Sequence, residues 1–144
     1  MRRPWSRLLL GLLAAGAASF LVGLGAMEIV RLVPCQGEGL VCNIDQAIGG
    51  YGVVILAVLG PIIYGVSLLI ARNRTVLLGV MIVLLVPILA FYLIVQTEHA
   101  LNIGLEPYRQ FRTLLVVVLP PALTVVVQYF VLRFALQEAK RAAA

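Results

Sequence analysis

Four apolar segments, each of about 20 residues or more, constrain this chain more than any other feature of its sequence. They cover about residues 8–30, 51–70, 76–95 and 113–132. A helix of about 20 residues is about 30 Å long, which matches the hydrocarbon thickness of a bilayer. Hydrocarbon offers no hydrogen-bond partner to the backbone, so each segment should be helical even where Val and Ile are frequent. The sequence therefore predicts an all-α integral membrane protein.

The composition points the same way. Of the 144 residues, 62% are hydrophobic and only 12% are charged, and the mean hydropathy is +1.08. A chain this short could not bury so much apolar surface in a water-soluble core. We expect one domain over residues 1–144, whose partners are membrane lipids and either other integral membrane proteins or further copies of itself. The net charge of +5 does not indicate nucleic acid, because the arginines are dispersed at the ends of apolar segments.

The basic residues also predict how the chain is threaded. One group falls at the inner ends of the segments: Arg2, Arg3, Arg7, Arg72, Arg74, Arg133, Lys140 and Arg141. The other group falls at the outer ends: Arg31, Arg109 and Arg112. Positive charge is retained in the cytoplasm, so both termini should be cytoplasmic in a bacterial inner membrane. The predicted fold is an antiparallel bundle of four transmembrane helices, with outer connections of about 20 and 17 residues.

Both cysteines lie in the first outer connection, in the stretch PCQGEGLVC. That connection would face an oxidising compartment, so Cys35 and Cys42 are expected to form a disulfide that staples the loop. The topology is similar to that of membrane thiol-oxidising proteins of the disulfide-bond-formation type. Those proteins use a Cys-x-x-Cys pair, whereas six residues separate the two cysteines here. Thiol-redox chemistry therefore stays an alternative.

Residues that could carry chemistry are scarce in the apolar segments. Glu28 is the one ionisable candidate, with Arg31 three residues later as a possible partner. The polar residues within the segments are Ser19, Tyr64, Ser67, Thr124 and Gln128. A zinc or copper site from Cys35, Cys42 and His99 is less favoured, because His99 belongs to a distant connection. We expect no catalytic residue, no metal and no cofactor.

Prolines interrupt three of the four segments. Pro61, Pro87, Pro120 and Pro121 each remove a backbone donor and should bend their helices. Two interpretations stay open. The bends could surround a cavity, which together with Glu28 and Arg31 would form an ion or ligand path. They could instead serve helix packing, since proline is frequent in membrane helices.

The first segment carries a face of small residues: Gly11, Ala15, Ser19 and Gly23 recur every four positions. Small side chains at this spacing allow another helix backbone to approach closely. The partner could be a helix of this bundle, another protein or a second copy.

The favoured function is therefore non-enzymatic: an accessory, assembly or regulatory subunit of a larger membrane complex. One alternative is a small oligomeric transporter or channel. The other is a membrane thiol-redox or lipid-modifying enzyme.

Overall fold

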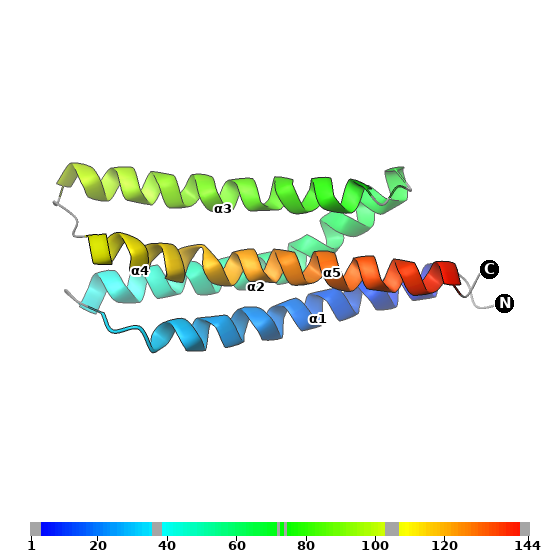
Figure 1. Cartoon of the computed structure of the whole chain (residues 1–144), viewed down its shortest axis with the longest axis horizontal. Helices are drawn as coiled ribbons and strands as arrows, with labels where there is room; N and C mark the ends of the chain where they lie inside the picture. Colours follow the sequence, from blue (N-terminus) through cyan, green and yellow to red (C-terminus); the bar gives the residue numbers. More distant parts are fainter. Residues whose placement is uncertain (1–3, 36–38, 72, 74, 103–106, 142–144) are drawn as a thin grey trace.

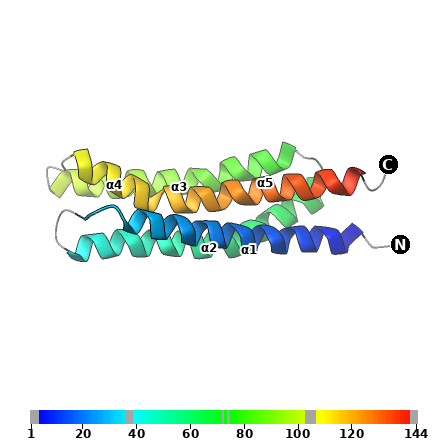
Figure 2. The same cartoon turned by 60° about the horizontal axis from the view of Figure 1, so that its bottom comes forward.

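The computed structural model describes residues 4–35, 39–71, 73, 75–102 and 107–141 (Figure 1). These residues form five helices: α1 (Pro4–Arg31), α2 (Gly39–Ala71), α3 (Thr75–Asn102), α4 (Pro107–Val117) and α5 (Leu119–Arg141). Successive passes run in opposite directions, with α4 and α5 together forming the fourth pass (Figure 1, Figure 2). The start of α1 and the end of α5 consequently lie at the same end of the bundle.

Four of the helices are long and apolar enough to cross a membrane. The qualifying stretches are Trp5–Arg31, Asn43–Ala71, Thr75–Ile94 and Leu119–Gln137. Large hydrophobic side chains cover their outward faces; Leu13 is 71% exposed and Ile70 is 81% exposed. Such a surface would promote association in water and suits contact with lipid. The prediction of an all-α chain with four long apolar helices is confirmed.

The predicted connections on the outer side were too long. Helix α2 begins at Gly39 rather than near residue 51, and α3 continues to Asn102 rather than ending near residue 95. The connections are residues 32–38 and 103–106. Polar residues ended the apolar segments in the sequence, but a helix satisfies its own backbone hydrogen bonds and can continue past the hydrocarbon boundary.

The fourth apolar segment is not one continuous helix. The chain leaves helical geometry at Val118, between α4 and α5. Pro120 and Pro121 have no amide hydrogen, so the carbonyls four residues earlier, at Val116 and Val117, lose their helical partners. Hydrogen bonds from Val118 N to Leu114 O and from Ala122 N to Val118 O, both 3.0 Å, keep the two helices nearly continuous. By contrast, Pro61 and Pro87 lie inside unbroken helices.

The hydrophobic core is concentrated toward the end of the bundle where α2 passes into α3. Its buried residues are Ala15, Tyr64, Leu68, Leu77, Val80, Leu84, Val125 and Leu132. Helix α3 contributes only from its first half: beyond Leu84, no side chain that the structure describes on α3 is buried. Helix α3 therefore packs most closely on the bundle along its first half, and its described side chains beyond Leu84 are partly or fully exposed.

Candidate functional site

A hydrogen-bonded polar cluster lies in the middle of the bundle. Gln128 of α5 is fully buried, and its amide nitrogen donates to Ser19 Oγ of α1 at 3.0 Å and to the Leu56 carbonyl of α2 at 2.8 Å. Ser19 in turn donates to the Gly16 carbonyl at 3.0 Å. One glutamine thus connects three helices. Its Oε1 atom has no hydrogen-bond partner among the described residues.

Glycines allow the helices to pack closely around this cluster. A Cβ added at Gly60 of α2 would overlap the Gln128 side chain, lying 2.8 Å from its Cδ. One added at Gly23 of α1 would overlap Val53 of α2 and lie 2.6 Å from Thr124 Oγ1 of α5. The backbones of α1, α2 and α5 therefore approach as closely as glycine permits. Around Gln128, the described part of the bundle centre is therefore occupied by residues of α1, α2 and α5.

A second polar group lies at the end where α2 begins. Asp45 of α2 is 4% exposed and accepts a hydrogen bond from Thr113 Oγ1 of α4 at 3.2 Å. The neighbouring Arg112 is 5% exposed, and its Nε has no hydrogen-bond partner among the described residues. The sequence places Arg112 at an outer helix end and does not single out Asp45. Nothing in a single sequence relates residues 68 positions apart, so this buried cluster could not be found from it.

The residues predicted to form an ion or ligand path do not gather at one place. Glu28 and Arg31 form a 2.7 Å ion pair on the outside of α1, with side chains 68% and 56% exposed. Pro61 lies against α1, where a Cβ at Gly16 would be 3.4 Å from its Cγ. Pro87 is exposed on α3.

The proline pair between α4 and α5 contributes to packing. Pro120 and Pro121 are both buried. A Cβ at Gly52 of α2 would lie 2.9 Å from Cγ of Pro121. Pro61 and Pro121 therefore each pack against a glycine position of a neighbouring helix. This geometry matches the packing interpretation of the prolines.

The small-residue face of α1 is used within the chain. Gly11, Ala15, Ser19 and Gly23 are all buried. A Cβ at Gly11 would lie 3.3 Å from Cβ of Ala135 on α5, while Ser19 and Gly23 contact Gln128 and Thr124 of the same helix. The face predicted to admit a partner helix thus receives α5 of this bundle.

The predicted cysteine and histidine sites fall at the edge of what the structure describes. Cys35 follows α1, and the backbone of Cys42 lies in the first turn of α2. The side chains of Cys42 and His99 lie outside the described residues. Among the residues that the structure describes, there is no free cysteine and no group of three or more potential metal ligands.

Comparison with known proteins adds no relative: no family model, curated protein or solved structure matches the chain. The fold therefore defines the class by itself. It is an all-helical protein with four helices long and apolar enough to cross a membrane.

Proposed function

We propose that this chain is a small non-enzymatic protein of a bacterial inner membrane, acting as an accessory, assembly or regulatory subunit of a larger membrane complex. The observation that carries the proposal is the filled interior. Gly23 and Gly60 bring α1, α2 and α5 into contact around Gln128. A protein whose centre is occupied by its own helices and side chains acts through its surface.

The proposed arrangement in the membrane is an antiparallel four-helix bundle with both termini cytoplasmic. The excess of basic residues near the start of α1, near the end of α5 and between α2 and α3 supports this orientation. A disulfide between Cys35 and Cys42 is part of the proposal. It would join the residues after α1 to the first turn of α2 in a compartment that permits disulfides.

The first test is gentle extraction from native membranes, followed by mass analysis of the intact particle. Other polypeptides in a fixed ratio are expected. A particle built only of this chain would exclude a stable complex.

A photo-crosslinking amino acid can then map the contact. Leu93, 60% exposed on the open half of α3, is the test position. Leu13, 71% exposed on the outward face of α1, is the matched control. The crosslinker at position 93 is expected to form adducts with another protein. The crosslinker at position 13 is expected to form adducts with lipid only.

A small oligomeric transporter or channel is the second candidate. The buried Asp45 and Arg112 favour it, because ionisable groups within membrane proteins often belong to ion or substrate pathways. Since the centre of one chain is filled, a path would have to run between copies, where the exposed Glu28 could also contribute. Flux into liposomes that is lost with Asp45→Asn, while the oligomer stays intact, would support this function over the first.

A thiol-redox or lipid-modifying enzyme is the third candidate. Replacing both cysteines by serine distinguishes a catalytic role of the cysteines from a disulfide that only stabilises the loop. Loss of stability would indicate a structural disulfide, whereas loss of turnover in a well-folded protein would indicate redox catalysis.

A further inference from the structure

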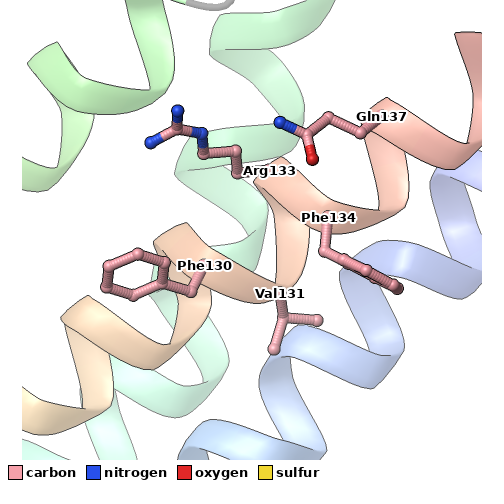
Figure 3. A pocket seen from close by; sticks show the side chains of 5 residues that line it. All are labelled: Phe130, Val131, Arg133, Phe134 and Gln137. Atoms are coloured by element: carbon pink, nitrogen blue, oxygen red, sulfur yellow. The ribbon is translucent and has the colours of Figure 1, made fainter.

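An open groove runs along α5 near the end of the bundle where α1 begins (Figure 3). Its volume is about 550 Å³. Its lining residues are Phe130, Val131, Arg133, Phe134 and Gln137. Phe130, Arg133, Phe134 and Gln137 are three, four and seven residues apart, so they share one face of α5. Figure 3 shows the polar ends of Arg133 and Gln137 next to each other, with the Phe130 ring at the left and the Phe134 ring at the right. The groove thus combines a cationic group and an amide with two aromatic rings.

The guanidinium in this groove contacts the neighbouring Tyr129. Arg133 Nη1 donates to the Tyr129 hydroxyl at 3.2 Å, and its guanidinium carbon lies 6.0 Å from the centre of the Tyr129 ring. Tyr129 itself meets Phe130 edge to face, with ring centres 5.3 Å apart. A guanidinium has five N–H donors in a planar fork, so one bond to Tyr129 leaves the others for a ligand.

The charge around the groove favours an anion. Arg133 is exposed, and none of the five lining residues is acidic. The groove lies at the end of the bundle where Arg7 is also exposed. A planar guanidinium can bind phosphate through two hydrogen bonds, and the Gln137 amide can add a third. Phe130 and Phe134 are 59% and 63% exposed, which leaves an apolar surface next to the anion position.

We propose that this groove binds the anionic headgroup of a phospholipid. The phosphate lies at Arg133 and Gln137, and the acyl chain lies along Phe130 and Phe134. This site does not depend on the proposed role as a subunit; it needs only that the four apolar helices lie in a bilayer. The adjacent cation and aromatic surface fits a lipid, which presents a phosphate and a hydrocarbon chain together.

The test is native mass spectrometry of the full chain, extracted from vesicles of equal parts phosphatidylglycerol and phosphatidylcholine. The wild type should retain phosphatidylglycerol over phosphatidylcholine by about tenfold, because the choline ammonium group offsets the phosphate charge next to Arg133, whereas phosphatidylglycerol keeps a net negative charge. Arg133→Gln should remove this preference. The matched control is Arg7→Gln, which removes an exposed charge at the same end and should leave the preference intact.

A second variant tests whether misfolding, rather than loss of the lipid contact, explains the effect of Arg133→Gln. Gln137→Glu keeps the Arg133 side chain but places a carboxylate four residues from it, which should pair with the guanidinium and also remove the preference. Circular dichroism checks that each variant keeps its helix content. Equal retention of the two lipids by the wild type, or an equal loss in Arg133→Gln and Arg7→Gln, would overturn the proposal. So would displacement of the retained lipid by inorganic phosphate, which would make the site one for a free anion.

Discussion

At the scale of single residues, the contact between Gly60 and Gln128 is among the tightest that the structure describes. A methyl group at position 60 would overlap the Gln128 amide, which is fixed by bonds to Ser19 and Leu56. We expect Gly60→Ala to lower the free energy of unfolding by about 1–3 kcal/mol, the usual effect of overpacking. Denaturant unfolding in mixed micelles measures this change.

Gly79 provides the matched control for Gly60. It lies in α3, and an added Cβ there would meet nothing within 4 Å. Gly79→Ala should therefore be neutral or stabilise by up to about 1 kcal/mol, because alanine favours helix more than glycine does. A double-mutant cycle adds a second check: Gly60→Ala should cost less when Gln128 is already alanine. An additive double variant would show that the two residues are not in contact.

At the scale of helices, the bend between α4 and α5 packs closely against α2 at Gly49 as well as at Gly52. Pro120 removes the amide that would bond the Val116 carbonyl. A Cβ at Gly49 of α2 would overlap that same carbonyl oxygen. Gly49→Ala should therefore separate α2 from α4 and lower the free energy of unfolding by about 1–3 kcal/mol. Thermal unfolding in detergent, followed by circular dichroism, measures the loss.

The adjacent glycine is the control for this prediction. An added Cβ at Gly50 would lie 3.8 Å from Cε of Met27, an ordinary contact distance. Gly50→Ala should change stability by no more than about 0.5 kcal/mol. If both variants were equally destabilised, the cause would be the helix backbone at this point rather than the contact with the Val116 carbonyl.

The sequence was sufficient to predict helices but not where they end. The four apolar segments indicated four long helices, because only a helix satisfies the backbone in hydrocarbon. The start of α2 was missed because Asn43 and Asp45 resemble loop residues, although here they continue a helix. The break at Val118 was missed in position, since a Pro-Pro pair predicts a bend without fixing its residue.

Candidate sites were harder to predict than helices. The spacing of Gly11, Ala15, Ser19 and Gly23 indicated a packing face, but periodicity does not identify the helix that occupies it. Gln128 was visible as a polar residue in an apolar segment, yet its bond to Ser19 joins residues 109 positions apart. Such pairings depend on how the helices are rotated against each other, and a single sequence does not contain that information.

At the scale of the whole molecule, the positions of the chain ends and of the cysteines can be tested together. The start of α1 and the end of α5 lie at one end of the bundle, and Cys35 lies near the other, beyond α1. If both termini are cytoplasmic, the cysteines face the outside. A membrane-impermeant maleimide applied to intact spheroplasts should therefore label the wild type only after reduction, because the proposed disulfide protects both thiols.

The opposite end provides the comparison. Asn73 is exposed between α2 and α3, where its side chain accepts a bond from Thr75 N at 3.5 Å. In a chain whose native cysteines are replaced by serine, Asn73→Cys should be labelled only after the membrane is permeabilised. Labelling of Asn73→Cys in intact spheroplasts would reverse the orientation. Labelling of the wild type from outside without reduction would instead keep the orientation and exclude the disulfide, because free thiolates are the species that react with maleimide.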